Sequence, residues 1–561
     1  MVNKGWEPKL PKSTAFVLIA IAVAGSVILP SIYGEPPKGS ETRKVVIRFP
    51  DQSPDPSDNK KPNDSKATRP DVKLTDVGRS SLTPVVGGQE NAKPITVATE
   101  EERNQKIATD WRNPSVVFFI TGKQYGYMEP CGCTGLENQK GGLSRRDSLL
   151  TSIRQRGWEV VPIDGGNQVR RRGAQSEIKY DWTANALNIM GYEATTFGED
   201  DLQLSVGSLL LSMANSKSGL FVSANVSVEP SFDMKFKTFS AKGKKIGITA
   251  VLGDESAKKI GNADIKLDRA VESLKKVMAD LKNEKCDYLI LIAQASLEES
   301  RIYAQEVPGF SLLITSGGYG EPTFRPEQIE GTATQMVQMG IKGMYAGLFG
   351  LFDDPAQPFR YQRIALSSQF PDSPRIAELF GKYQDQLKTV SYEGLGLRPV
   401  SHPSSREFVG SEKCGECHTT AFDIWKNTPH AHATDSIVEP PERTMARHFD
   451  PECLSCHVTG WNPQKFHPYR TGYESLEATP LMVANGCENC HGPGAKHAAA
   501  ELGEIDADSQ LKELLRNDMK LPMDKARDKC LECHDIDNSP DFHRDEAFEE
   551  YWEKVKHYGK D

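Results

Sequence analysis

Four short motifs near the C-terminal end combine cysteine and histidine at a fixed spacing. Each has two cysteines three positions apart and a histidine directly after the second. Cysteines at this spacing lie on one side of a helical turn, where both can form thioethers with one porphyrin edge, and the adjacent histidine can then bind the iron. The motifs predict four covalently bound c-type haems. The predicted attachment residues are Cys414, Cys417, Cys453, Cys456, Cys487, Cys490, Cys530 and Cys533, and the predicted proximal ligands are His418, His457, His491 and His534.

Zinc is the alternative for these motifs, because two CxxC pairs can form a tetrahedral Cys₄ site. Haem is favoured because a histidine follows every pair, which a Cys₄ site would not require, and because further histidines remain for the opposite face of each iron. A thioredoxin-type redox CxxC is disfavoured, since there are four copies and none lies within a βαβ pattern.

Histidine is confined to one part of the chain. All 12 histidines lie between His402 and His557, and eight of the 11 cysteines share that tail. The net charge of −9 is spread over 561 residues, which disfavours a nucleic-acid binder because such proteins carry a basic domain. The tail and the histidine-free region before it therefore need separate explanations.

The N-terminal segment predicts export from the cytoplasm. Lys4, Lys9 and Lys12 precede an apolar run over 14–33, which is about the length that crosses ~30 Å of hydrocarbon. Residues 1–33 are predicted to be an uncleaved membrane anchor, with a signal peptide cleaved near Ala22-Val23-Ala24 as the alternative. The bulk is then expected in the periplasm, either held at the inner membrane by a single pass or secreted. Residues 34–112, rich in Pro, Asp and Lys, are predicted to be a flexible linker.

Strand-like and helix-like segments alternate in the middle region, which predicts a layered α/β domain. Further strand-like stretches at 340–352 and 359–366 close the region. The predicted strands are 116–120, 159–163, 194–197, 220–224, 246–251, 288–292 and 312–315, and the predicted helices are 143–156, 182–190, 270–283 and 296–305.

An ordered series of motifs in this region resembles the 5′-nucleotidase branch of the calcineurin-like metallophosphoesterases. The series consists of the loop 121–130 (TGKQYGYMEP), the helix start 141–146 (GGLSRR), 164–167 (DGGN) and 198–201 (GEDD). The resemblance implies a metallophosphoesterase-like α/β sandwich over 113–375.

The positions that carry the metal ligands in that family depart from its pattern. Lys123 and Tyr125 replace the Asp and His of the first motif, Asn167 replaces the second Asp, and Glu199-Asp200 replaces Asn-His. Because an ammonium disfavours a dication, the hydrolase chemistry is predicted to be lost. No catalytic residue is assigned. A residual metal-dependent phosphoesterase remains the alternative, since Asp164, Glu199, Asp200 and Asp201 can bind one hard cation through oxygen.

Three cysteines lie outside the haem motifs. Cys131 and Cys133 form a CxC that is compatible with a strained disulfide, a redox pair, half of a soft-metal site, or two incidental thiols. Cys286 is predicted to be a small buried hydrophobe.

From 408 to 561 the tail resembles the tetrahaem cytochromes c of nitrifying bacteria, with 376–407 as a connector. The resemblance rests on the segment 425–431 (WKNTPHA) and on 485–494 (NGCENCHGPG). It implies a mostly α-helical tetrahaem domain with His430, His497 and His557 as distal ligands. It also implies a second site without a protein distal ligand, which predicts an open iron at His457. No role is assigned to His432, His448, His467 or His543.

These observations predict electron transfer between a membrane or periplasmic donor and an acceptor, neither of which the sequence identifies. One alternative is an enzyme that converts a small nitrogen or sulfur compound at an open haem. A further possibility for the middle domain is a binding or scaffold module that serves the haems.

Overall fold

The computed structural model describes residues 100–130, 139–318, 320–440, 445–536 and 538–559. The predicted membrane segment, most of the predicted linker and the Cys131–Cys133 pair lie outside the described residues. Within the described ranges no helix combines the length and apolarity needed to span a membrane. The end of the predicted linker is structured. Helix α1 (Glu100–Asn104) is followed by Ile107 and Trp111, which are buried in a hydrophobic core of the α/β domain. The α/β domain therefore begins before the predicted boundary at 113.

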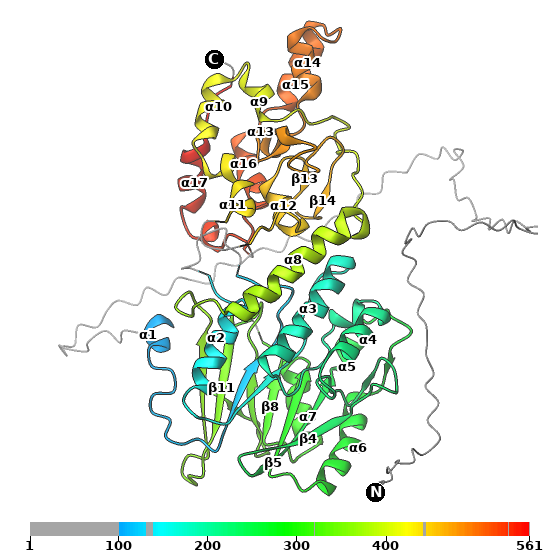
Figure 1. Ribbon diagram of the computed structural model, residues 1–561, viewed down its shortest axis with the longest axis vertical. Coiled ribbons are helices and arrows are strands. Elements are labelled where there is room, and N and C mark those ends of the chain that lie inside the picture. The colour runs from blue at the N-terminus through cyan, green and yellow to red at the C-terminus, as the bar shows by residue number, and fades with distance from the viewer. Residues whose placement is uncertain (1–99, 131–138, 319, 441–444, 537, 560–561) are drawn as a thin grey trace, which may run out of the picture. The chain divides into compact units, whose positions relative to one another are not determined.

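Two mixed β-sheets form the centre of the α/β domain (Figure 1). In the first sheet, β1 (Val116–Thr121) and β2 (Val160–Asp164) run parallel and pair Thr121 with Asp164, so the carboxyl ends of both strands meet at one edge. The four-stranded sheet has the order β12 (Phe359–Ala365), β11 (Tyr345–Leu351), β1 (Val116–Thr121), β2 (Val160–Asp164). The six-stranded sheet has the order β4 (Phe236–Ala241), β5 (Lys244–Leu252), β7 (Tyr288–Gln294), β8 (Leu312–Thr315), β10 (Gln335–Gln338), β9 (Glu327–Gln328).

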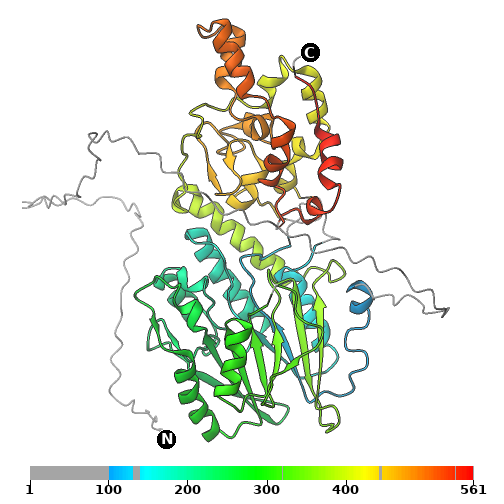
Figure 2. The same cartoon turned by 180° about the vertical axis from the view of Figure 1, so that it is seen from behind.

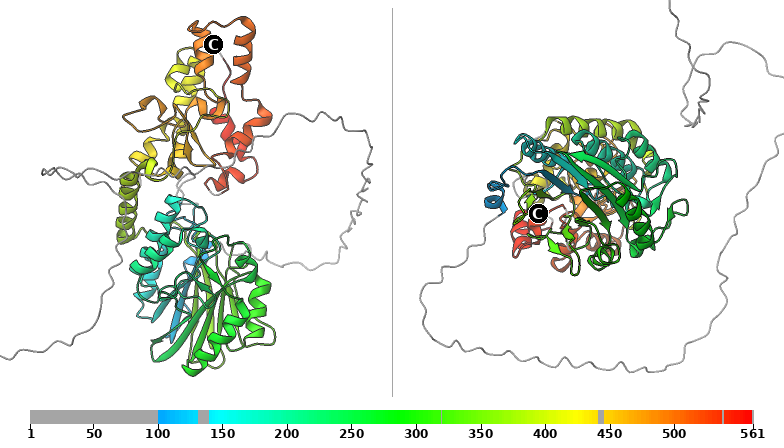
Figure 3. Two further views of the ribbon diagram at one scale, coloured as in Figure 1. Left: turned by 90° about the vertical axis from the view of Figure 1, so that its right-hand side faces the viewer. Right: turned by 90° about the horizontal axis from the view of Figure 1, so that it is seen from below.

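The strands divide their apolar side chains between the two faces of each sheet. In β1, Val116, Phe118 and Ile120 face the core between the sheets, whereas Val117 and Phe119 face the outer helices. This alternation follows from the two-residue period of a strand. Figure 3 shows strands enclosed between helices, which confirms the predicted α/β sandwich. On the four-stranded sheet lie α2 (Leu143–Arg154), α3 (Ala174–Met190) and α8 (Pro374–Gly394), and on the six-stranded sheet lie α6 (Ala270–Asn283) and α7 (Leu297–Glu306).

The α/β core continues past the boundary expected at 375. Helix α8 occupies much of the interval 376–407 that was expected to be a connector. It buries Ile376, Phe380, Tyr383 and Leu387 in the same core as α2 and α3. Two predicted strands, 194–197 and 220–224, form only isolated bridges, in which Ala194 and Thr195 take part.

The described residues of the tail form short helices and one two-stranded ribbon, in agreement with the predicted mostly α-helical class (Figure 2). Its two apolar clusters are small: one surrounds Leu454 and Trp461, and the other surrounds Phe542. The principal helices are α9 (Ser411–Gly415), α10 (Thr419–Lys426), α12 (Pro451–His457), α13 (Cys487–His491), α14 (Ala495–Leu502), α15 (Ser509–Asp518), α16 (Met523–Leu531) and α17 (Ala547–Val555).

Candidate functional site

Each of the four CxxCH motifs lies in a short helix or at its end. Helices α12 and α13 contain their motifs entirely, while α9 and α16 contain the first cysteine of theirs. In the first and fourth motifs the backbone N–H of the histidine donates to the backbone carbonyl of the first cysteine. The distance is 3.0 Å from His418 to Cys414 and 2.8 Å from His534 to Cys530. The two residues are therefore one helical turn apart on the same side of the chain.

Three of the four motif histidines face another histidine ring. The ring centroids lie 6.3 Å apart for His418 and His497, 6.0 Å for His534 and His430, and 5.6 Å for His491 and His557. With metal–nitrogen bonds of about 2 Å, two imidazoles that bind one iron from opposite faces have centroids roughly 6 Å apart. The three pairs therefore have the spacing that a bis-histidine haem requires.

Hydrogen bonds fix the tautomer of several of these rings. The Nδ1–H groups of His457 and His491 donate to the carbonyls of Ala433 and Met519, each at 2.7 Å. A carbonyl can only accept, so Nδ1 carries the proton and Nε2 keeps the lone pair with which a ligand binds iron. Burial also lowers the pKa of both histidines and thereby favours the neutral form that binds metal.

His457 of the second motif has no such histidine partner. No ring contact within the described ranges joins His457 to another histidine. His448 packs on Phe449 at 4.0 Å between centroids, and His467 packs on Tyr469 at 5.4 Å. Within the described ranges, the ring contacts of these two nearby histidines are with aromatic residues and not with His457.

The remaining histidines have other contacts. His432 is exposed and lies beside Asp435, and His543 donates from Nε2 to the His534 carbonyl at 2.9 Å. His402 packs edge-on against Phe408.

Cysteines of different motifs approach one another. The thiols of Cys414 and Cys487 lie within interaction range of each other, which links the first and third motifs. The thiols of Cys533 and Cys456 are likewise within interaction range, which links the fourth and second motifs. The Cys490 thiol also lies within electrostatic range of Cys530, which links the third and fourth. The four attachment sites are therefore packed closely together.

Lys123, Tyr125 and Asn167 occupy positions where the sequence comparison with phosphoesterases places metal ligands. The Lys123 ammonium is buried and donates to the Ser316 carbonyl at 2.7 Å, and burial lowers its pKa. Asn167 donates through Nδ2 to the Asp200 carboxylate at 3.1 Å. Lys123, Tyr125 and Asn167 all have positive φ, between 50° and 60°, a conformation that costs non-glycine residues free energy.

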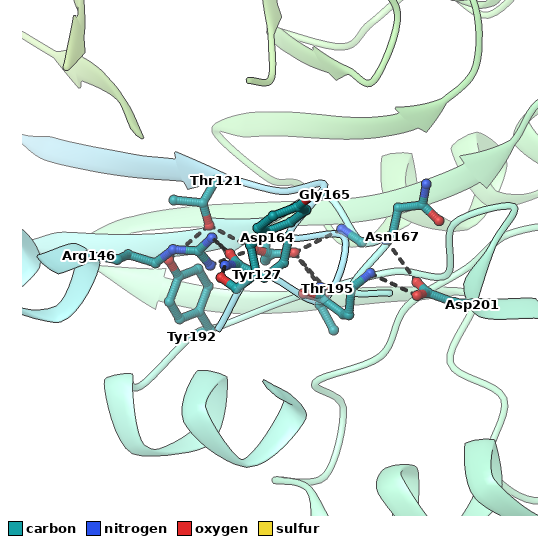
Figure 4. A network of polar contacts seen from close by, with 12 residues as sticks. Thr121, Tyr127, Arg146, Asp164, Gly165, Asn167, Tyr192, Thr195 and Asp201 are labelled. Atoms are coloured by element: carbon teal, nitrogen blue, oxygen red, sulfur yellow. Dashed lines mark hydrogen bonds and ion pairs between the residues drawn. The ribbon is translucent and has the colours of Figure 1, made fainter. Parts of the chain in front are cut away.

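Asp164, one of the carboxylates considered for a hard cation, is saturated by protein donors (Figure 4). It forms a fully buried ion pair with Arg146 at 3.1 Å. Thr121 also donates to it at 2.7 Å, as do the Gly166 N–H at 2.9 Å and Gln168 at 2.6 Å. Asp164 therefore has a structural role.

The other three carboxylates considered for a hard cation also have protein partners, and Asp200 accepts from Asn167 Nδ2 at 3.1 Å. Asp201 accepts backbone N–H groups from Asn167, Gln168, Val169 and Gly198, at 2.7–3.2 Å, while burial raises its pKa to about 7. Glu199 pairs with Lys259 at 3.0 Å. Across the described ranges no cluster of three His, Cys, Asp or Glu side chains has a metal-binding arrangement.

The α/β domain contacts the helix that carries the second haem motif. Glu452 pairs with Lys179 at 2.7 Å and with Arg171 at 2.9 Å. Asp450 accepts hydrogen bonds from Gln175 at 2.6 Å and from Tyr383 at 3.0 Å. These partners lie far from the tail in sequence, and no sequence pattern pointed to them.

Residues 413–492, which include the first three CxxCH motifs, match the family of cytochrome c554 and c-prime. The tail is similar to cytochrome c554. Over 98 residues the chain is 34% identical to cytochrome c-554 of Nitrosomonas europaea, which covers 16% of this chain and 39% of that protein. The match to cytochrome c554 confirms the predicted resemblance and implies covalently bound c-type haem in the tail.

The middle region is similar to 5′-nucleotidases, as predicted. Over 293 residues the chain is 21% identical to the 5′-nucleotidase of Bos taurus, which covers 47% of this chain and 50% of that protein. A 5′-nucleotidase precursor from Thermus thermophilus aligns in structure with a TM-score of 0.43 and 16% identity, over 49% of this chain and 59% of that one. The chain thus spans from two fifths to three fifths of these relatives.

Proposed function

We propose that this chain is an exported electron-transfer protein with four covalently bound c-type haems. The observation that carries the proposal is the set of three histidine pairs, each of which joins a CxxCH histidine to a distant histidine at 5.6–6.3 Å. Haem iron supplies reversible one-electron transfer when it is bound in this way. His418, His491 and His534 are the proposed proximal ligands of these three sites, and His497, His557 and His430 are their respective distal ligands.

The protein's own contribution is to fix the ligands. The carbonyls of Ala433 and Met519 hold His457 and His491 in one tautomer. A histidine ligand that is already held in position need move little when the iron it binds changes its oxidation state. The approach of Cys414 to Cys487 and of Cys456 to Cys533 supports short distances between cofactors.

A second candidate function is reaction at an open iron. It is favoured by the environment of His457, whose ring contacts no other histidine within the described ranges. An iron with a single histidine can bind a small diatomic or a small nitrogen or sulfur compound. The second site is therefore the proposed place for such chemistry.

The α/β domain serves in this proposal as a non-hydrolytic binding or scaffold module. Lys123 brings a positive charge to the place where dications would need negative ligands, and Asp164 is committed to Arg146. The apolar run at 14–33 with its preceding lysines supports a single-pass anchor in the inner membrane and a periplasmic location for the rest. The electron donor and acceptor are expected to be redox proteins of that compartment.

The test is haem stoichiometry and ligand binding in the full chain, purified from a host that matures c-type cytochromes. We expect four covalent haems per chain, three for C487A/C490A, and four for the control C286A. Reduced protein should bind about one carbon monoxide per four haems, and C453A/C456A, which removes the attachment cysteines of the second haem, should abolish this binding. A haem-free protein that holds zinc would overturn the haem proposal, whereas four low-spin haems that bind no carbon monoxide would overturn only the open site.

A further inference from the structure

Two residues of the α/β domain surround the glutamate that precedes the first cysteine of the second haem motif. Lys179 of α3 lies 2.7 Å from one Glu452 oxygen, and Arg171 lies 2.9 Å from the other. The Lys179 side chain is only 8% exposed, compared with 44% for Arg171. Lys179 is therefore the buried counter-charge of Glu452.

The first turn of α12 is held from the same domain. Asp450 caps this helix by accepting the Glu452 N–H at 2.9 Å, and the same carboxylate accepts from Gln175 and Tyr383. Since Cys453 stands one residue after Glu452, the position of the second attachment site depends on side chains outside the tail.

These charges act on the attachment site itself. Lys179, Glu452, Asp450 and Arg447 all lie within electrostatic range of the Cys453 sulfur. Reduction of a haem iron removes one positive charge, so a nearby cation favours the reduced form and a nearby anion the oxidised form. The effect is strong where the charges are shielded from water.

We propose that Lys179 is a positioning residue of the second haem site, which compensates Glu452 beside Cys453 and thereby raises the reduction potential of that haem. The inference rests on the proposed function, because it requires haem at the second motif. It gives the α/β domain a role in electron transfer that needs no hydrolytic site.

Lys179 also connects the haem site to the loop that replaced the first metal motif. A Cβ added to Gly126 would lie 3.7 Å from Lys179 Cδ, so the aliphatic part of the lysine packs against that loop. The loop and the second haem motif thus contact the same side chain.

The experiment is a redox titration of the full haem-loaded chain, with each haem followed by its visible and EPR signals. K179M should lower one of the four midpoint potentials, with a change of about tenfold in the ferric-to-ferrous equilibrium constant, which is 59 mV for a one-electron couple. E452Q should raise the same midpoint, and K179M/E452Q should return it close to the wild-type value. K179R keeps the positive charge, so the midpoint potential of this haem should stay close to the wild-type value.

The matched control is K217M, which removes a lysine from a surface pair with Glu193 in the same domain. It should leave all four midpoints unchanged. If K179M shifts no midpoint, or shifts all four equally, the proposal is wrong. A K179M protein that lacks one haem would show a purely structural role and also overturn it. Failure of the proposed function is separate, because it would appear as missing haem in the wild-type chain.

Discussion

His430 lies against His534, with 6.0 Å between the ring centroids, although His430 follows the first haem motif and His534 ends the fourth. The other pairs likewise join residues that are distant in sequence: His497 faces His418, and His557 faces His491. The order of the motifs along the chain therefore does not give the order of the ligands.

The pairing predicts which iron opens when a distal histidine is removed. H430A should raise carbon monoxide binding by the reduced protein from about one to about two equivalents, because it frees the iron at His534. The control is H432A, on the same short turn but exposed, which should change nothing. In a C530A/C533A background H430A should add no equivalent, whereas H497A should still add one. If H430A and H497A added the same amount of carbon monoxide binding in the C530A/C533A background, the proposed pairing of His430 with His534 would be wrong.

The α/β domain should not hydrolyse nucleotides. With Mn²⁺, Zn²⁺ or Mg²⁺ added, release of phosphate from AMP should stay far below ordinary enzyme rates, about 1–10³ s⁻¹. The reason is that Lys123 replaces a carboxylate and Asp164 is committed to Arg146. Metal-dependent turnover at enzymatic rates would show that a cation binds despite these contacts.

Removal of one partner of the buried Arg146–Asp164 pair should strongly destabilise the α/β domain. Both side chains are 0% exposed, so R146M leaves a carboxylate uncompensated in the interior and should cost about 3–5 kcal/mol. The measurement is the shift of the α/β transition in denaturant unfolding of the full chain. K258M, which breaks a pair whose side chains are both 68% exposed, should have no measurable effect. A R146M transition at the wild-type position would refute a structural role for Asp164.

Because of Lys123, the free energy of unfolding of the α/β domain should change with pH in the alkaline range. Burial lowers the pKa of Lys123 in the folded chain from 10.5, so the unfolded chain holds the proton to a higher pH than the folded chain does. Stability contributed by this group therefore rises with pH between the lowered folded value and 10.5. The free energy of unfolding of wild type relative to K123M should increase as the pH rises toward 10.5 and should level off above it. Parallel curves for the two proteins would show that burial does not disfavour the charged lysine.

The haem motifs could be predicted because covalent attachment requires residues that are neighbours in the sequence. The partners of the motif histidines could not be paired in this way, since each pair is made by tertiary structure. For α8, a signal was present: Ile376, Phe380, Tyr383 and Leu387 recur at intervals of four, three and four residues, which is the period of an amphipathic helix. The Lys179–Glu452 contact left no trace in the sequence.

The strands of the two sheet centres were predicted to within a few residues, because buried β-branched runs such as 246–251 are typical of strands. The segments 194–197 and 220–224 have similar composition, but each pairs with a neighbouring segment only through isolated bridges. Local composition therefore identifies a buried extended segment without showing whether it forms a ladder.

The contacts among the attachment cysteines give the cofactors a linear order. Cys414 meets Cys487, Cys490 lies near Cys530, and Cys533 meets Cys456. With haem at every motif, the spatial sequence is first, third, fourth, second. Under the proposed function, the second haem would form one end of this row and the first haem would form the other. The third and fourth motifs would then hold the two inner cofactors, so loss of either inner haem would interrupt electron transfer along the row, whereas loss of an outer haem would shorten it.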